Sequence, residues 1–337
     1  MAPELKAADW QNWRWQLRHA QRGLSGLAKV LNVAQSCLQS DGLSDVVQRY
    51  RFQATPYYLS LIDWQDAADP IRRQCLPDVH ELDAEPEYMA DPFAEIHSAQ
   101  ASGIVHRYPD RVLLPITSDC AVYCRHCTRK NTLDGVLSTT TARQDDAIKY
   151  IRDHKAVREV LISGGDPLLL EDNKLSDLLS RLYAIEHVEV VRIGTRVPVV
   201  LPMRIDSSLV EKLRGHGPLW INTQFNHPRE LTPEAVAACA MLTDAGIPVS
   251  NQSVLLKGVN DDFETMHELC AKLQRNRIRP YYVFHCDPIV GISHLRTDIA
   301  AAKELEHKLW QSLGGLALPR FVADVPGKAG KLPVACL

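Results

Sequence analysis

Two hydrophobic patterns divide the chain near residue 104. Residues 1–103 repeat apolar positions at helical spacing, as at Leu27, Val30 and Leu31, without a clear alternation of strands and helices. Beyond residue 104, β-branched runs alternate with longer segments of helical character. Strands are predicted at 112–117, 159–163, 188–195, 218–225, 247–255 and 280–285. Helices are predicted at 141–153, 171–186, 206–215, 232–245, 261–276 and 298–313, with Asp206, Pro233 and Asp298 at helix starts.

Six strand–helix units in series predict a parallel sheet, either doubly wound or a partial barrel. No Gly-x-Gly-x-x-Gly follows the first strand, which favours a partial (β/α)6 barrel over a dinucleotide-binding fold. We therefore expect an α/β protein in three parts. These are an N-terminal helical region and wrap (1–103), the barrel core (104–314) and a C-terminal segment (315–337). The acidic stretch 77–97 predicts a linker or surface wrap.

Composition narrows the function classes. The 337 residues are 45% hydrophobic and 23% charged, as in a globular protein with a sizeable core. A net charge of −3 offers no basic excess for nucleic acid, and no apolar run approaches the roughly 20 residues of a membrane span. Nine cysteines, odd in number and scattered outside one loop, with no signal-peptide pattern, indicate reduced thiols and a cytoplasmic location.

The loop 120–127 carries three cysteines, Cys120, Cys124 and Cys127, spaced C-x3-C-x2-C. Three thiolates can hold a [4Fe–4S] cluster and leave one iron open for another ligand. Zinc, with His126 as a fourth ligand, is the alternative. A disulfide would require an oxidising compartment. The spacing alone favours iron–sulfur and leaves zinc open.

Other polar residues follow the strands, where parallel barrels place their chemistry. Gly164 and Gly165 permit close backbone approach to a ligand, and Asp166 could pair with an ammonium group. A plain strand-to-helix turn explains the same residues. His126 could stack on adenine or face solvent.

Two further sets of cations are candidates. Arg107 and Arg111 could grip a phosphate, with ordinary surface arginines as the alternative. The Gly-rich loop 324–333 carries Lys328 and Lys331. A lysine held over a site can form a Schiff base with pyridoxal phosphate (PLP), and two solvated lysines are the alternative.

These motifs together resemble the lysine 2,3-aminomutase family, radical S-adenosylmethionine (SAM) enzymes that also use PLP. The resemblance covers nearly the whole chain and is carried by 106-HRYPDRVLL-114, 124-CRHCTRK-130, 163-SGGDPLL-169, 225-FNHPRELT-232 and 319-PRFVADVPGKAGK-331. It implies a radical-SAM barrel, an isomerase that converts L-lysine to β-lysine, and a [4Fe–4S] cluster, SAM and PLP as cofactors. It also implies an amino acid substrate and a reductant such as flavodoxin or ferredoxin, and leaves a homo-oligomer open.

The resemblance implies a role for each matching position. Cys120, Cys124 and Cys127 would hold the cluster, and Lys331 would bind PLP. The residues expected around SAM are His126, Ser163, Gly164, Gly165, Asp166 and Gln252. Arg107 and Arg111 would approach the PLP phosphate. Arg129 would hold the substrate carboxylate, and Asp287 and Asp324 its distal ammonium group.

The two carboxylates indicate a cationic substrate, because a buried ammonium without a partner is costly. Arginine remains an alternative, since carboxylates also bind guanidinium, and so does a lysine aminomutase that serves elongation factor P. The chain departs from the family pattern at Gln224, where a histidine is expected, and at Lys328, where glycine is expected. It ends six residues after Lys331, so we expect no C-terminal zinc cluster.

Overall fold

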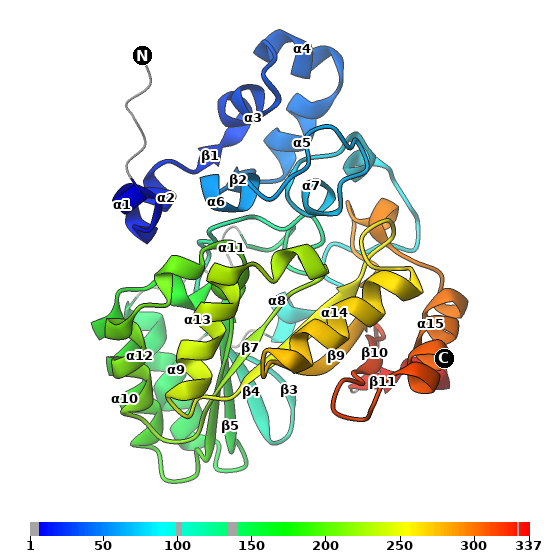
Figure 1. Ribbon diagram of the computed structural model, residues 1–337. Helices are drawn as coiled ribbons and strands as arrows, with labels where there is room; N and C mark the ends of the chain where they lie inside the picture. The colour runs from blue at the N-terminus through cyan, green and yellow to red at the C-terminus, as the bar shows by residue number, and fades with distance from the viewer. Residues whose placement is uncertain (1–6, 99–102, 134–140, 329) are drawn as a thin grey trace.

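The computed structural model describes residues 7–98, 103–133, 141–328 and 330–337, and within them nine strands form one sheet (Figure 1). The strand order is β11-β10-β9-β8-β7-β6-β5-β4-β3. The strands are β3 (Val105–Tyr108), β4 (Arg111–Thr117), β5 (Glu159–Gly164), β6 (Val190–Gly194), β7 (Leu219–Thr223), β8 (Val249–Leu255), β9 (Arg279–His285), β10 (Arg320–Asp324) and β11 (Lys331–Pro333).

Strands β4 to β10 are all parallel to their neighbours and follow one another in chain order, whereas β3 and β11 are antiparallel edge strands. Right-handed crossovers in one direction place their helices on one face of the sheet, as in a barrel. The covering helices are α9 (Thr141–Asp153), α10 (Asp172–Tyr183), α12 (Ser207–Arg214), α13 (Pro233–Asp244), α14 (Phe263–Arg275) and α15 (Ile299–Ser312). The two edges do not pair, and the predicted partial α/β barrel is confirmed.

Local sequence explains where these helices begin. The Asp206 carboxylate accepts from the Leu209 N–H at 2.9 Å, and that of Asp298 accepts from the Ala300 N–H at 2.7 Å. Such caps satisfy amide groups that have no partner within the helix. Pro233 is the first residue of α13, where its missing N–H is harmless. The three predicted helix starts are confirmed.

The N-terminal region forms a layer of short helices over one end of the sheet (Figure 1). Its helices are α1 (Ala7–Trp10), α2 (Trp13–Arg18), α3 (Gly23–Leu31), α4 (Gln35–Ser40), α5 (Leu43–Arg49), α6 (Pro56–Leu59) and α7 (Pro70–Cys75). The last N-terminal helix, α8 (Glu95–Ser98), lies apart from this layer and contacts β3. A small pair of strands, β1 (Gln21–Arg22) and β2 (Gln53–Ala54), was not predicted. Gln53 binds the cysteine loop, because its carbonyl accepts from the Tyr123 N–H at 3.0 Å and its amide donates to the Cys120 carbonyl at 2.7 Å.

The acidic stretch 77–97 is more than a solvated wrap. It contains the 3-10 helix η1 (Val79–Leu82), and Glu81 is fully buried. The Glu81 carboxylate accepts from Arg125 and from Lys130, the latter at 2.8 Å, and the two cations lower its pKa against the effect of burial. This segment therefore holds the cysteine loop from outside the barrel.

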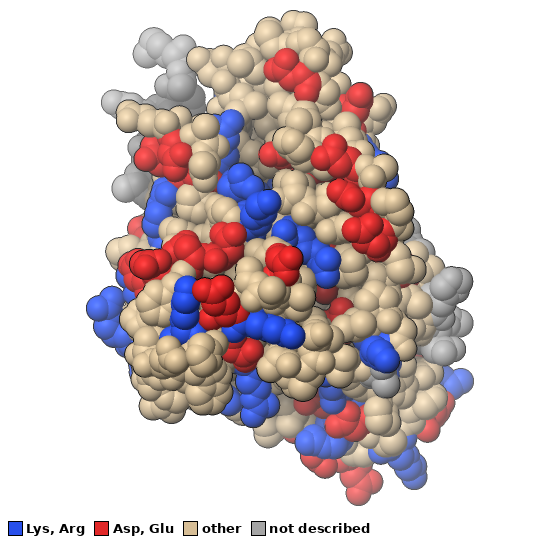
Figure 2. All heavy atoms as spheres, turned by 90° about the vertical axis from the view of Figure 1, so that its right-hand side faces the viewer, with Lys and Arg blue, Asp and Glu red and all other residues tan. Residues whose placement is uncertain are grey.

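Two surface properties agree with the composition. Acidic and basic side chains are interspersed on the face that Figure 2 shows, without separation by sign. Among the described helices, none has the length and apolar character that crossing a bilayer requires.

Candidate functional site

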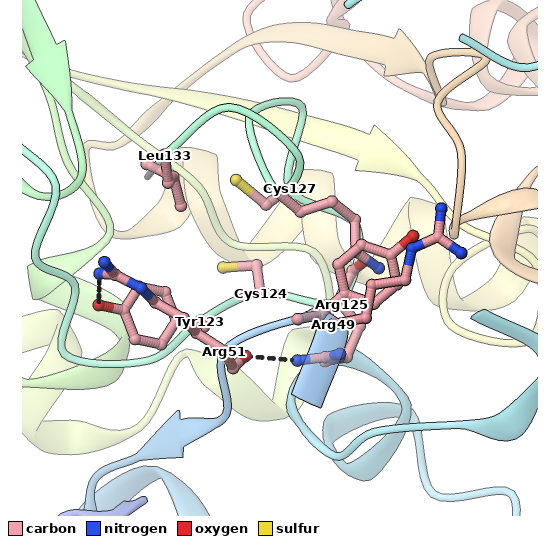
Figure 3. Close-up of a pocket in the computed structure, with 9 residues that line it drawn as sticks. Arg49, Arg51, Tyr123, Cys124, Arg125, Cys127 and Leu133 are labelled. Atoms are coloured by element: carbon pink, nitrogen blue, oxygen red, sulfur yellow. Dashed lines mark hydrogen bonds between the residues drawn. The ribbon is translucent and has the colours of Figure 1, made fainter. Parts of the chain in front are cut away.

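The cysteine loop leaves the C-terminal end of β4 and brings two of its three thiols to one cavity. Cys124 and Cys127 line this cavity together with Tyr123, and Figure 3 shows both sulfur atoms directed into it. All three loop cysteines are free and partly buried. Burial and the nearby Cys124 raise the pKa of the Cys127 thiol to about 11, and burial, followed by the charge of Cys127, raises the pKa of the Cys120 thiol well above its usual value. The three thiols thus lie near enough to affect one another.

The donor set fits a cluster better than a single ion. Within the described residues, no three side chains of His, Cys, Asp or Glu converge on a point that could hold one metal ion. A [4Fe–4S] cube does not need such a point, because each thiolate binds a different iron. Soft thiolates are also its usual ligands. The arrangement therefore suits a cube held by three cysteines.

Gly164 and Gly165 place the next strand end against the start of this loop. Gly164 has φ of +113°, and a Cβ there would collide with the Thr117 carbonyl oxygen. A Cβ at Gly165 would collide with the carbonyl of Asp119. The Gly165 N–H donates to the Thr117 carbonyl at 2.5 Å, so this N–H is already used. The glycines let two backbones touch beside Cys120.

Asp166 has protein partners for both carboxylate oxygens. Oδ1 accepts from the Thr195 hydroxyl at 2.6 Å and from the Leu168 N–H at 3.2 Å, and Oδ2 accepts from the Arg196 N–H at 2.7 Å. Burial raises its pKa, and these hydrogen bonds oppose that effect. Asp166 thus ties the ends of β5 and β6 together. A contact between Asp166 and the SAM ammonium remains a prediction.

His126 is buried beside Gln224 and Asn226, which follow β7. Its Nε2 lies 2.9 Å from the amide nitrogen of Gln224 and 3.3 Å from that of Asn226. Both amides donate to a neutral ring, and burial lowers the His126 pKa well below its usual value. Nδ1 is buried and has no hydrogen-bond partner. Gln224, the departure from the family pattern, is therefore the residue that orients this histidine.

Lys331 is the first residue of β11, the edge strand beside β10. Its ammonium lies 3.4 Å from the Tyr108 hydroxyl and 3.5 Å from the Asp324 carboxylate. It also lies 5.4 Å from the Tyr108 ring centroid and 5.5 Å from that of Phe284. A primary amine between two aromatic rings suits a flat, aldehyde-bearing cofactor. Ala329, in the same loop, lies outside the described residues.

Arg107 and Arg111 reach the same neighbourhood from β3 and β4. The Arg107 guanidinium donates to Asp324 at 2.9 Å and to the Lys328 carbonyl at 3.0 Å. The Arg111 guanidinium lies 3.8 Å from the Tyr108 ring centroid. The antiparallel β3–β4 turn thus brings both cations beside the Lys331 side chain, where a phosphate-bearing cofactor would find positive charge.

Asp287 and Asp324 are the acids of this region. Asp287 follows β9, and its Oδ2 accepts from the Thr128 hydroxyl at 3.0 Å. Its Oδ1 is buried and has no hydrogen-bond partner. Burial, followed by the charge of Asp324, raises the pKa of Asp287 to about 7. One carboxylate oxygen is therefore available for a cationic ligand.

Arg129 is paired within the protein. Its guanidinium donates to both carboxylate oxygens of Glu95, on α8, at 2.7 and 2.8 Å. Arg129 lowers the pKa of Glu95 against the effect of burial. Sequence patterns did not predict this partner, because Glu95 lies in the stretch 77–97, which was predicted to be a linker or surface wrap.

The remaining predicted residues lie where the strand pattern put them. Ser163 is near the end of β5 and Gln252 is within β8, and both are half-buried. Sequence reasoning placed Arg196 at the end of a strand but assigned no role to it, to Tyr108 or to Glu95, and all three contact predicted site residues directly. Tyr108 stands between Arg107 and Arg111 in the quoted motif, so its position between two candidate cations was the available signal.

The chain is similar to known enzymes over nearly its whole length. The Radical SAM superfamily matches residues 114–270. L-lysine 2,3-aminomutase of Clostridium subterminale is 45% identical over 98% of this chain and 79% of its own length. The Fusobacterium nucleatum enzyme of that name is 42% identical over 98% and 78%. Glutamate 2,3-aminomutase of Clostridioides difficile is 38% identical over 97% and 77%.

Proposed function

The chain belongs to the lysine 2,3-aminomutase family of radical SAM enzymes, and we propose that it converts L-lysine to β-lysine by moving the amino group from C2 to C3. The family resemblance predicted from the motifs is confirmed, and so are the isomerase class and the three cofactors, a [4Fe–4S] cluster, SAM and PLP. The choice of lysine rests on the residues beside Lys331.

The unpartnered oxygen of Asp287 is the observation that carries this proposal. Its Oδ1 has no hydrogen-bond partner and its pKa is raised to about 7, so a cationic ligand would stabilise the ionised form of this buried carboxyl. Asp324 lies close enough to add to that rise in pKa, but it is paired with Arg107 and Lys331, so Asp287 is the acid of the two that no described cation pairs. The distal ammonium of lysine supplies the missing charge, and the side-chain carboxylate of glutamate would be repelled.

Each cofactor has a matching set of residues. Cys120, Cys124 and Cys127 would hold the cluster, and Lys331 would hold PLP, with Arg107 and Arg111 at its phosphate. When bound, the cluster and SAM supply the radical that abstracts hydrogen, and PLP supplies the ring that delocalises electrons during nitrogen migration.

Five strand-end positions and one loop histidine would surround SAM. Ser163, Gly164, Gly165 and Asp166 close the end of β5, Gln252 extends from β8, and His126 contacts Gln224, which follows β7. The Asp166 carboxylate already has three donors, so its contribution is to fix the ends of β5 and β6. His126, neutral and oriented by Gln224, offers a flat ring to adenine.

Arg129 would hold the substrate carboxylate by the same bidentate geometry that it uses with Glu95. An incoming α-carboxylate therefore has to displace Glu95 or share the guanidinium with it. Asp287 lies near enough to Arg129 for its charge to act on the guanidinium, and it accepts from the hydroxyl of Thr128, the preceding residue. A molecule with a carboxylate and a distant ammonium matches both groups.

The proposed reaction also implies a substrate class and an electron donor. The substrate is a small amino acid, and a one-electron carrier such as flavodoxin or ferredoxin would reduce the cluster in the cytoplasm. A homo-oligomer remains compatible with this function.

Anaerobic reconstitution tests the proposal. The purified chain, loaded with iron, sulfide and PLP, should hold about four irons and four sulfides and cleave SAM reductively. Supplied with L-lysine, it should release β-lysine. Bound zinc, with no cluster and no SAM cleavage, would refute the radical mechanism. A cluster with SAM cleavage but a preference for another amino acid would refute only the substrate assignment.

A further inference from the structure

Arg196 touches one of the three loop cysteines directly. It follows β6 and caps the short helix α11 (Val197–Val200). Its Nη1 donates to the Cys124 sulfur at 2.9 Å, and only 8% of the residue is exposed. This pairing spans 72 residues of sequence. A buried guanidinium is thus aimed at one corner of the proposed cluster site.

The rest of the Arg196 guanidinium is held in place by buried partners. Nη2 donates to Glu230 at 2.7 Å, to the Gln74 side-chain oxygen at 2.6 Å and to the Tyr58 hydroxyl at 2.9 Å. Nε donates to the Gln224 carbonyl at 3.3 Å. Glu230 is itself fully buried and also accepts from two backbone N–H groups. The orientation of Nη1 is therefore fixed by the protein before any cluster binds.

The other two cysteines lack an equivalent contact among the described residues. The Cys127 sulfur accepts a backbone N–H from Arg129 at 3.4 Å, which is longer and uncharged. No side chain of the described residues donates a hydrogen bond to the Cys120 sulfur. Among the residues that the structure describes, Cys124 is thus the one loop cysteine with a charged side chain on its sulfur.

We propose that Arg196 is a positioning residue that raises the reduction potential of the cluster through its hydrogen bond to Cys124. The proposal rests on the proposed function, because it requires Cys124 to be a cluster ligand. Hydrogen bonds to cluster sulfurs and nearby positive charge stabilise the reduced form, which carries one more electron. Because the site is buried, this effect is screened less than at a surface.

Redox titration of the reconstituted enzyme, followed by electron paramagnetic resonance, tests the proposal. Arg196→Met removes the charge and the donor, and Arg196→Lys keeps the charge without the planar fork. For Arg196→Met, we expect the ratio of reduced to oxidised cluster at a fixed potential to fall at least tenfold, which is 59 mV for one electron. Arg196→Lys should lie between this variant and the wild type.

Arg204→Met is the matched control. Arg204 is a buried arginine, 1% exposed, that donates to the carbonyls of Leu168 and Leu170 and to Asp172. It makes no contact with a loop cysteine, so its loss should leave the potential within a few millivolts of wild type. Equal shifts in the two methionine variants would overturn the proposal, because general loosening would then explain both.

Arg196→Met also leaves Glu230 without its cation and could impair folding. The double variant Arg196→Met/Glu230→Gln removes both charges at once. It should retain wild-type iron content and still show a lowered potential, because the hydrogen bond to Cys124 is absent. An unchanged potential with a full cluster would refute the role of Arg196. Failure of the wild-type chain to assemble a cluster would instead refute the proposed function.

Discussion

The two ends of the candidate site differ in how their charges are balanced. Around the cysteine loop, each buried acid has partners within the protein: Glu81 contacts Arg125 and Lys130, Glu230 contacts Arg196, and Asp166 accepts from the Thr195 hydroxyl and two backbone N–H groups. Around Lys331, Asp324 contacts Arg107 and Lys331, but the Asp287 carboxylate has only the Thr128 hydroxyl and one oxygen without a partner. The buried acids around the cysteine loop therefore have partners, whereas one buried acid near Lys331 has an oxygen without one.

This difference separates a scaffold from a binding site. A fully paired network fixes geometry, which suits cysteines that must hold a resident cofactor. An unpartnered buried acid is unfavourable until a ligand supplies the opposite charge. The free-energy penalty of burying the Asp287 carboxylate without a cation is therefore relieved when a cationic substrate binds, which favours such a substrate.

Replacing Lys331 should have the largest effect. In Lys331→Ala the primary amine beside Tyr108 and Phe284 is lost, and we expect no β-lysine formation. Borohydride reduction of the wild-type enzyme followed by peptide mass analysis should find the pyridoxyl group on Lys331. Lys328→Ala is the matched control and should retain label and activity. Label on Lys328, or survival of labelling in Lys331→Ala, would show that the assignment is wrong.

Removing the unpaired acid should have the next largest effect. Asp287→Asn keeps an oxygen for the Thr128 hydroxyl but loses the charge. We expect kcat/KM for lysine to fall about a thousandfold, as for a buried ammonium that loses its partner. The iron content should stay at the wild-type level, because Asp287 lies outside the cysteine network. A fall below threefold would contradict the role of this acid.

The same acid predicts a pH dependence of stability without substrate. The Asp287 pKa rises from 3.8 to about 7 in the folded protein, so the folded state keeps a proton that the unfolded chain releases between these values. Its contribution to stability is therefore present at low pH and is lost as pH rises from about 4 to 7. At roughly 1.36 kcal/mol per pH unit, the loss is at most about 4 kcal/mol.

Denaturant unfolding of the cofactor-free chain at pH 5 and pH 8 measures this loss. In Asp287→Asn the carboxyl no longer titrates, so the variant should be more stable than wild type at pH 8, and its difference from wild type should shrink toward pH 5. A variant less stable than wild type at pH 8 would contradict the predicted cost of ionising the buried Asp287 carboxyl.

The Glu95–Arg129 pair predicts the smallest effect. Glu95→Gln removes the anion that occupies the Arg129 guanidinium, so the substrate carboxylate should bind more easily. We expect the KM for lysine to fall about threefold to tenfold with kcat little changed. Glu304→Gln, at an exposed surface ion pair with Lys308, is the control and should change neither constant. A higher KM in Glu95→Gln would mean that Glu95 orients Arg129 and does not compete with the substrate.

Local patterns were enough to predict the barrel. Each of the six predicted strands overlaps one of β4 to β9, and Asp206, Pro233 and Asp298 mark true helix starts, because these features depend on neighbouring residues. The strands β3, β10 and β11, which lie at the two ends of the strand order, were missed. They are short or follow turns, and they gain their hydrogen bonds only from the assembled sheet.

The partners of the site residues could not be predicted in the same way. Glu81 and Glu95 lie in a stretch whose acidic pattern is typical of a solvated surface, and only the folded chain brings Arg125 and Arg129 to them. Arg196 and Cys124 are 72 residues apart in sequence, and they meet because Arg196 follows β6 and the cysteine loop follows β4 at the same end of the sheet. Local residue patterns predicted the candidate groups, and the sheet determined their neighbours.

A competition assay tests the central claim most directly. The reconstituted enzyme is incubated with equal concentrations of L-lysine, L-arginine, L-ornithine and L-glutamate, and the β-amino acid products are quantified. The two acids beside Lys331 predict β-lysine as the main product, with lysine favoured over glutamate by about a thousandfold in kcat/KM. Preferential conversion of glutamate would contradict the claim that an unpaired carboxylate selects the substrate.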